Sequence, residues 1–365
     1  MFRLYALIAL SVLLSGNAYA QDSLSLFDEE PAPQASESQK QNVSENVPAS
    51  SSESPAKEDS ALFSFMGLKI PNFISSSSEN ENSLETLTQK AEDGDISAQL
   101  KLGYTYLYGM EGLNADYAKA FHYYELAANQ NDKIGINNLG TLYYNGIGTQ
   151  RNPRKAALLF AKAAEAGNFD AATNLGFIYV SGIGIEQNVE AGIANFEKAV
   201  TGGNVLAQFM TGCAYYYGKH RQLNFIKAAP LIKAAADQGF DEAQFLIATM
   251  YMNGQGYPQN YGNAVKYLKR AVEQGHLQAM MKLADIYSGN TKFPADIQQA
   301  HTLYNIAAVR GVRGAGELRE KVEGKMKIAQ IMNSQTEAEN FKDKPSDLTI
   351  YVRKTFGTNI CRYVQ

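Results

Sequence analysis

The sequence predicts an all-α protein, a solenoid of stacked helix pairs. Landmark residues return at a constant step of 36 residues along most of the chain. They are a tyrosine (Tyr143, Tyr179, Tyr215, Tyr251, Tyr287), an alanine (Ala171, Ala207, Ala243, Ala279, Ala315) and a glycine (Gly167, Gly203, Gly239, Gly275, Gly311). A fixed period of this length is typical of repeat arrays in which each unit packs only on its neighbours.

Six full repeats are expected, beginning near Ala98, Gly135, Ala171, Ala207, Ala243 and Ala279. A lone second helix at 84–93 precedes them as an N-terminal cap, and a seventh helix from about Ala315 to Met332 closes the far end. The solenoid therefore covers residues 83–333, and residues 334–365 form a C-terminal extension. In that extension we expect a polar linker over 335–347 and strand character at Leu348–Val352, which is rich in β-branched residues.

Each repeat is predicted to form two antiparallel helices. In the third repeat Ala171, Leu175, Gly176 and Tyr179 fall on one helical stripe. A glycine inside a helix costs about 1 kcal/mol against alanine, so its return at one register predicts a close crossing with the second helix. At the matching register of the second helices stand Tyr124, Phe160, Phe196, Ile232, Leu268 and Tyr304.

The pattern resembles the Sel-one-like repeat, a short relative of the tetratricopeptide repeat. The residues that carry the resemblance are the Ala171–Tyr179 core, the Gly182-x-Gly184 turn and the Ala163-Ala164-x2-Gly167 end. The resemblance covers about residues 84–330. It implies a right-handed superhelical solenoid of antiparallel helix pairs whose first helices line the concave side. The sixth repeat departs from the pattern, because Ser288-Gly289-Asn290 replaces the Gly-x-Gly turn.

The N-terminus has the pattern of a secretory signal peptide over residues 1–20. Arg3 precedes an apolar run, and Ala18-Tyr19-Ala20 is a small-x-small cleavage site. Residues 21–82 are expected to be a disordered, acidic and Ser-rich linker with an apolar island at 62–74. The island either packs on the first helices or is a linear motif for another protein. The expected location is the periplasm or the exterior, with no integral membrane segment after cleavage.

Charge and motifs narrow the function classes. Residues 21–60 carry nine acids and two lysines, a balance of -7, while the remainder from residue 61 is nearly neutral with 30 bases and 28 acids. A near-neutral solenoid argues against nucleic acid as a partner. The Gly-x-Gly turns lack the rest of a phosphate-binding loop, and the four histidines fall at unrelated repeat positions. We therefore predict no cofactor, no metal and no enzymatic activity.

The predicted site is a protein-binding groove on the concave side. Aromatic and methionine side chains near the ends of the first helices are good anchors for a partner peptide. The candidates are Tyr108, Tyr144, Tyr216, Tyr217, Met250 and Met252; inter-repeat packing is the alternative role for them. The two cysteines, Cys213 and Cys361, either form a disulfide that draws the C-terminal extension onto the fourth repeat or remain separate thiols.

The function that follows is an exported, non-enzymatic scaffold or adaptor that binds a partner protein or peptide in the concave groove. Exported proteins with the resembling repeat also include inhibitors of sensor kinases. The alternatives are therefore a regulator or inhibitor of an envelope enzyme or sensor kinase, and a cell-wall-active enzyme. A catalytic cluster of acid, base and nucleophile would favour the enzyme, and the sequence shows none.

Overall fold

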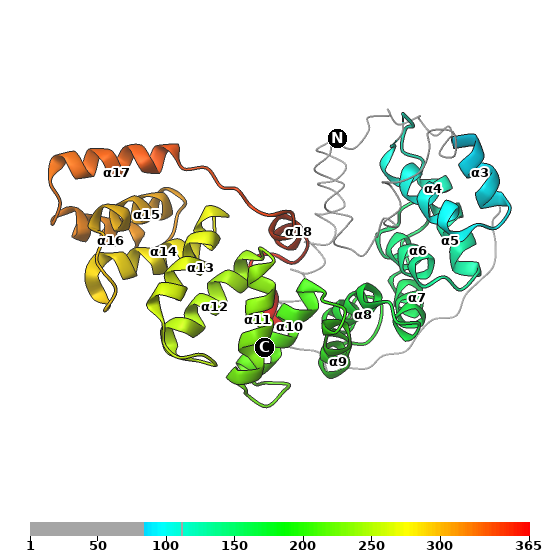
Figure 1. The fold of residues 1–365 in the computed structure, drawn as a ribbon, viewed down its shortest axis with the longest axis horizontal. Coiled ribbons are helices and arrows are strands. Elements are labelled where there is room, and N and C mark those ends of the chain that lie inside the picture. Colours follow the sequence, from blue (N-terminus) through cyan, green and yellow to red (C-terminus); the bar gives the residue numbers. More distant parts are fainter. Residues whose placement is uncertain (1–83, 111) are drawn as a thin grey trace, which may run out of the picture. The chain divides into compact units, whose positions relative to one another are not determined.

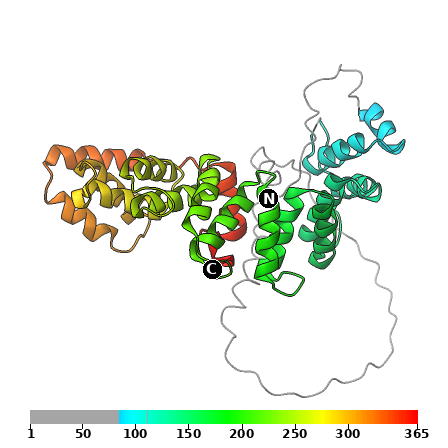
Figure 2. The same ribbon diagram turned by 60° about the horizontal axis from the view of Figure 1, so that its bottom comes forward.

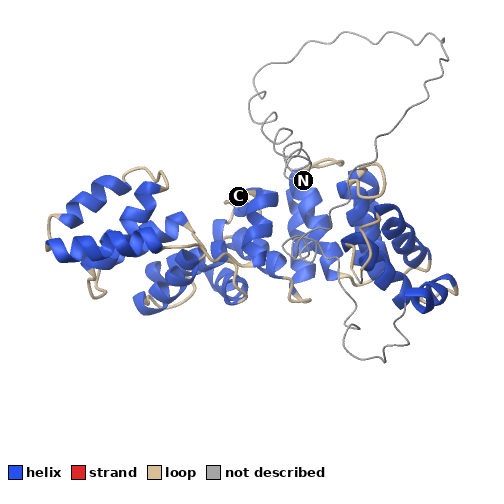
Figure 3. Cartoon of the chain, turned by 90° about the horizontal axis from the view of Figure 1, so that it is seen from above, coloured by secondary structure: helices blue, strands red, loops and turns tan. Residues whose placement is uncertain are grey.

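The computed structural model describes residues 84–110 and 112–365. This part of the chain is helical and contains no strand (Figure 3). The predicted signal peptide (1–20), the acidic linker (21–82) and the apolar island (62–74) lie outside the described residues.

Six antiparallel helix pairs form the body of the structure, as the period predicted (Figure 1). The first helices are α4 (Ile96–Tyr108), α6 (Lys133–Asn145), α8 (Phe169–Ser181), α10 (Val205–Tyr217), α12 (Asp241–Asn253) and α14 (Leu277–Asp285). The second helices are α5 (Tyr117–Asn129), α7 (Pro153–Glu165), α9 (Val189–Val200), α11 (Phe225–Asp237), α13 (Tyr261–Glu273) and α15 (Ile297–Val309). The capping helix α3 (Leu84–Glu92) precedes them.

Every second helix starts in the same way. An Asp or Asn at its N-cap accepts a hydrogen bond from the backbone N–H of the third residue of the helix, as Asn152 does from Lys155. The backbone N–H of that N-cap residue donates to the carbonyl of the periodic tyrosine, for example from Asn152 to Tyr143 over 2.7 Å. The periodic tyrosine therefore closes the turn between the two helices, and this bond recurs in all six repeats.

The predicted helix crossing lies at the recurring glycine. A Cβ atom placed on Gly176 would lie 2.6 Å from Phe196 Cε1, and one on Gly212 would lie 2.6 Å from Ile232 Cγ1. No carbon side chain fits at such a distance without a shift of its neighbour. The small residue of the first helix and the large residue of the second helix thus form one packing unit, repeated along the array.

The sixth repeat departs from the others where its sequence does. Its first helix α14 continues into a π-helical turn, η2 (Ile286–Asn290), in which Gly289 has a left-handed backbone with φ 87°. The N-cap Asp296 of α15 still donates its backbone N–H to Tyr287 over 2.9 Å. The altered turn therefore changes the exit of the helix and leaves the helix pair intact.

The C-terminal end of the array differs from the prediction of one seventh helix. Two helices, α16 (Ala315–Glu323) and α17 (Ile328–Asn340), replace it, separated at Gly324. The fully buried His301 of α15 lies 2.6 Å from the hydroxyl of Ser334 and anchors α17 on the last repeat. The expected linker from residue 335 is thus helical up to Asn340, and α17 crosses the predicted boundary at 333.

The prediction of strand character at Leu348–Val352 is wrong, because these residues lie in helix α18 (Asp347–Phe356). Ser346 caps this helix by accepting a hydrogen bond from the Thr349 backbone N–H. A 3-10 turn, η3 (Ile360–Tyr363), follows. The helix lies beside α10 and α12 rather than beside α17, its predecessor in the chain (Figures 1 and 2). Tertiary packing overrides the weak β preference of this segment.

Candidate protein-binding face

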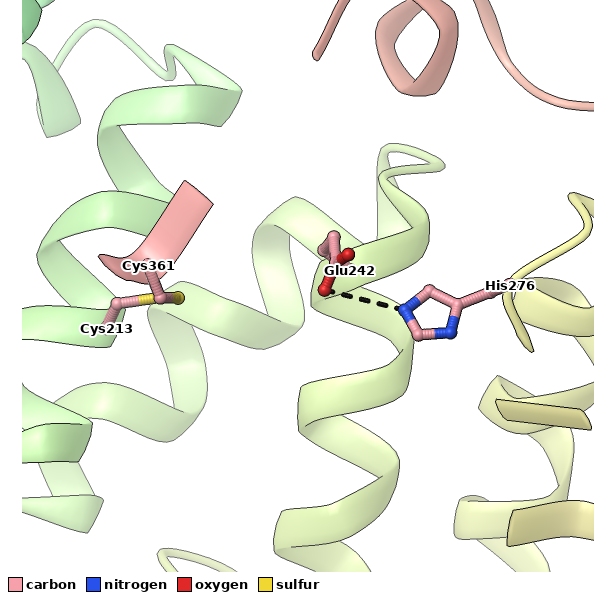
Figure 4. Close-up of a disulfide and its surroundings, with 4 residues drawn as sticks. All are labelled: Cys213, Glu242, His276 and Cys361. Atoms are coloured by element: carbon pink, nitrogen blue, oxygen red, sulfur yellow. Dashed lines mark ion pairs between the residues drawn. A yellow bond between two sulfur atoms is a disulfide. The ribbon is translucent and has the colours of Figure 1, made fainter. Parts of the chain in front are cut away.

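The C-terminal extension lies on the first helices of the array. We call the side of α8, α10 and α12 that contacts α18 and η3 the first-helix face. Cys213 of α10 and Cys361 of η3 form a disulfide with their Cα atoms 5.7 Å apart (Figure 4). Both residues are buried. The bond links positions 148 residues apart, so it fixes the end of the chain on the fourth repeat.

Aromatic side chains continue this contact onto the third repeat. The rings of Phe177 in α8 and Phe356 in α18 stack with their centroids 4.4 Å apart. Phe177 and Cys213 occupy the same position of neighbouring repeats, since they are 36 residues apart. The extension thus runs along one register of the first helices. Burial raises the pKa of the Tyr351 hydroxyl, and the nearby Tyr144 of α6 adds to the rise.

A buried charge holds the start of α18. Asp241, the first residue of α12, is 1% exposed. Its Oδ2 accepts a hydrogen bond of 2.6 Å from Arg353 Nη2, and its Oδ1 lies 3.0 Å from the Thr349 hydroxyl. A buried carboxylate is stable only when it is paired and hydrogen-bonded, and both partners come from α18.

The residue at the N-cap explains why this carboxylate is available. The other five first helices have a polar N-cap side chain that accepts from the helix backbone, namely Asp95, Asp132, Asn168, Asn204 and His276. Helix α12 instead has Phe240 there, fully buried with its ring 4.8 Å from that of Phe209. The acid stands one position later, where the other repeats have Ile96, Lys133, Phe169, Val205 and Leu277.

A pair of glutamines forms the second docking point. Gln274 donates through Nε2 to the Gly239 carbonyl and to Gln244 Oε1, each over 2.9 Å. Its own Oε1 accepts from the Ser346 backbone N–H over 2.9 Å and lies 2.7 Å from the Thr349 hydroxyl. The capping turn of α18 therefore contacts the amide of a repeat side chain that is itself held in place.

The segment before α18 is also held at the fifth and sixth repeats. The guanidinium of Arg310 lies 2.9 Å from Asp343 Oδ1, and the Lys344 backbone N–H donates to the Glu273 carbonyl over 2.7 Å. Gly275 lies so close to the Asp343 carboxylate that a Cβ atom there would clash with it. The extension thus runs from the sixth repeat to the third and approaches Tyr144 of the second, opposite to the chain direction of the solenoid.

His276 links the two repeats next to this site. Its Nδ1 accepts from the Ala279 backbone N–H over 3.2 Å and so caps α14. Its Nε2 lies 3.5 Å from Glu242 Oε2 on α12 (Figure 4). The ring of Phe245 stacks on the imidazole at 4.8 Å. This histidine therefore connects α12 of the fifth repeat to α14 of the sixth, a role that the sequence did not indicate.

Two of the six candidate binding residues lie next to the extension. Tyr217 is 42% exposed, and burial raises the pKa of its hydroxyl while a hydrogen bond with Gln365 opposes the rise. Tyr144 is half-buried; burial raises its pKa, Arg151 lowers it, and Tyr363 of the extension raises it. Residues of the C-terminal extension therefore lie beside both of these tyrosines.

The other four candidates face different surroundings. Tyr216 is half-buried, with its ring 4.9 Å from Tyr217 and its hydroxyl 3.5 Å from Gln255. Met252 is half-buried against the core. Tyr108 is only 5% exposed and Met250 is fully buried, so for these two the structure favours the alternative role, inter-repeat packing. They are buried because a first helix packs on its own second helix and on both adjacent repeats.

The structure also bears on the enzyme alternative. Within residues 84–110 and 112–365, no group of three or more His, Cys, Asp or Glu residues could hold a metal ion. Ser334, His301 and Glu323 meet in the order of a hydrolase triad. Both Ser334 and His301 are fully buried, and the serine hydroxyl donates to the Ile331 carbonyl, so it cannot reach a substrate. This group joins α15, α16 and α17.

Comparison with known proteins defines the class. The Sel1 repeat family matches residues 96–132, 134–168, 169–204, 205–240, 241–276 and 277–311, which together are more than half of the chain. The chain therefore belongs to the Sel1 repeat family. Both the fold class and the six repeats predicted from the period are confirmed. Repeats of this family act as protein-interaction scaffolds.

Two solved structures share the fold at low sequence identity. A Sel1 repeat protein from Oxalobacter formigenes is 27% identical with a TM-score of 0.53, covering 67% of this chain and 98% of that one. A protective antigen of uropathogenic Escherichia coli is 22% identical with a TM-score of 0.52, covering 75% of this chain and 66% of that one, and shows the fold alone.

One curated relative is a component of an ERAD-associated E3 ubiquitin-protein ligase in Arabidopsis thaliana, HRD3B. It is 30% identical over an alignment of 108 residues, and the match covers 21% of this chain and 18% of that protein. The chain thus spans less than one fifth of the length of that relative.

Among the described residues, no helix is both long enough and apolar enough to cross a bilayer.

Proposed function

We propose that this chain is an exported, non-enzymatic scaffold that binds a partner protein through its first helices. The observation that carries the proposal is the docking of α18. The first-helix face already holds one helix by a buried ion pair and a stacked ring, and the amide of Gln274 at the end of α13 adds to them. A surface with these contacts has the chemistry for protein recognition by a helix in a groove.

Export is supported by two separate features. The sequence pattern of residues 1–20 is that of a cleavable signal peptide. The disulfide between Cys213 and Cys361 is a kind of bond that persists in oxidising compartments such as the periplasm. The HRD3 relative, as a component of a larger assembly, supports an adaptor role rather than catalysis.

Affinity capture tests the proposal. The oxidised, tagged chain is expressed with its leader and recovered from the envelope fraction, and the retained proteins are identified by mass spectrometry. The intact mass of the recovered protein is expected to be that of a chain beginning at Gln21. Retention of the leader, together with the absence of any protein enriched over an unrelated exported bait, would overturn the proposal.

A pair of tyrosine variants makes the capture test specific to the face. Tyr217 is partly exposed beside the extension, whereas Tyr215 bonds to Glu197 on the second helix of the preceding repeat at 3.1 Å. Tyr217→Ala is expected to weaken capture with an unchanged melting curve. Tyr215→Ala is expected to lower the melting temperature first.

A further inference from the structure

We infer that the first-helix face is a binding site for an amphipathic partner helix, and that α18 is a tethered occupant of this site. The inference rests on the proposed function and adds the chemistry of the partner to it. Four observations carry it: the way α18 is attached, its apolar stripe, its polar contacts and the disulfide.

Helix α18 is attached to the solenoid as a ligand is. Residues 341–346 join it to α17 without helical structure, and its contacts lie on repeats far away in the sequence. Its apolar stripe, Leu348, Tyr351 and Val352, is buried against the solenoid. The opposite side carries Asp347 and Lys354, which are exposed. An amphipathic helix with its apolar side in a groove is a common mode of peptide recognition.

The polar contacts indicate which helices would fit this site. The hydroxyl of the N-cap residue donates a hydrogen bond to the Gly239 carbonyl over 3.0 Å. The hydroxyl of a threonine three residues later lies within hydrogen-bond distance of Asp241 and Gln274. A basic residue seven positions after the cap pairs with the same carboxylate, as Arg353 does. We therefore assign to the partner an amphipathic helix with a Ser/Thr cap, a threonine at the third position and an arginine at the seventh.

The disulfide gives the resident helix its advantage over a partner. Cys361 follows the end of α18 by five residues, so the covalent bond holds the helix near its site at a high effective concentration. A helix supplied in trans must compete with that concentration. Loss of the bond leaves α18 tethered only through residues 341–346, and the site becomes accessible to the competitor.

The test uses the full chain and a synthetic peptide of residues 341–359, labelled at its N-terminus. This probe contains the cap, the threonine and the arginine but no cysteine. Fluorescence anisotropy compares the oxidised wild type with a chain carrying Cys361→Ser and Arg353→Glu. In that variant α18 loses the disulfide that holds it, and the glutamate at position 353 repels Asp241, while the residues of the site on the solenoid are unchanged.

Saturable binding to the double variant, at least tenfold tighter than to the oxidised wild type, supports the inference. A probe carrying Arg353→Glu is expected to bind at least tenfold more weakly, because it places a like charge against Asp241. Equal binding to the two chains would place the probe elsewhere and overturn the inference. Absence of binding by the double variant would overturn it too, as would loss of its cooperative melting, which would make α18 part of the core.

The capture experiment is independent of this one. Partner capture with no binding of the probe would support the scaffold role and overturn the helix-binding site. Probe binding with no captured partner would support the helix-binding site and overturn the scaffold role.

Discussion

The first and the fifth repeats contain the same pair of glutamines, and only one pair is used for docking. In the first repeat Gln130 donates to Gln99 Oε1 over 2.8 Å and to the Gly94 carbonyl over 3.1 Å. In the fifth, Gln274 makes the equivalent bonds to Gln244 and Gly239, both at 2.9 Å. Gln130 is exposed, whereas Gln274 also accepts bonds from α18.

The comparison shows that the repeat itself builds the docking geometry. In both repeats the first-helix glutamine is held by a carbonyl eight residues earlier, Ala91 or Ala236. What distinguishes the fifth repeat is one acid. In the first repeat Asp95 is the N-cap and bonds to its own helix, whereas Asp241 lies one position further on and bonds to α18. A shift of one position turns a capping group into a binding group.

The largest effect is expected from the helix crossing inside a repeat of the array, away from the contacts that hold α18. Gly176→Val adds a branched side chain where Phe196 leaves no space and should cost about 3 kcal/mol by overpacking. Gly316→Val is the control, because that helical glycine has open space around it. Chemical denaturation measures both. Equal stabilities of the two variants would mean that the helices cross elsewhere.

The next effect isolates the ion pair with α18 that Asp241 of the fifth repeat makes and Asp95 of the first repeat does not. Arg353→Met leaves the buried Asp241 without its ion pair, and a hydrogen bond to a charged group contributes about 1.5–3 kcal/mol. Since the arginine is 30% exposed, we expect the lower part of this range. Hydrogen exchange of the α18 amides should accelerate about tenfold or more. The exposed neighbour gives the control Lys354→Met, and equal acceleration in both would refute the role of the pair.

Substituting each glutamine separately shows whether its main role is in docking α18 or in stacking the repeats. Gln274→Ala removes both docking bonds and the bond to Gln244, and should cost about 1–3 kcal/mol. Gln130→Ala removes only bonds within the array from an exposed residue, and should cost about 0.5–1.5 kcal/mol. Denaturation and α18 exchange are measured for each. If Gln130→Ala were the more damaging, the glutamine would matter for stacking and not for docking.

The smallest effect concerns the glycines that end the repeats. Gly275→Ala and Gly311→Ala both place a Cβ in the left-handed region, with φ 82° and 79°, at a similar cost of about 1–2 kcal/mol. Only at Gly275 does the new carbon meet Asp343 of the extension; at Gly311 the space is open. The difference between the two variants therefore measures the contact with the extension. No difference would show that residues 341–346 are loosely placed.

The array was predictable because its information is periodic and local. Gly176 indicated the crossing with Phe196, and the tyrosines marked the turns. The position of α18 was not, because its helical form depends on Asp241 and Gln274, which are more than 70 residues away. A signal was nonetheless present. Phe240 occupies a capping position that is polar in the other repeats, and an acid follows it.

The candidate site was predictable only in part. The helical turn directs Tyr217 away from the core stripe, and its side chain is partly exposed beside Gln365. Tyr108 and Met250 are buried, because residues off one stripe of a helix still meet the adjacent repeats. The contact of α18 with the first-helix face could not be predicted from the period, since α18 is not a repeat.

Hydrogen exchange of the oxidised full-length chain tests most directly whether α18 covers the first-helix face. We expect the amides of 350–356 to exchange at least a hundredfold more slowly than an unstructured peptide of the same sequence. We also expect Cys361→Ser to accelerate them together with the amides of Cys213 and its neighbours in α10. Exchange of 350–356 at the unstructured rate in the oxidised chain would show that α18 does not cover the face.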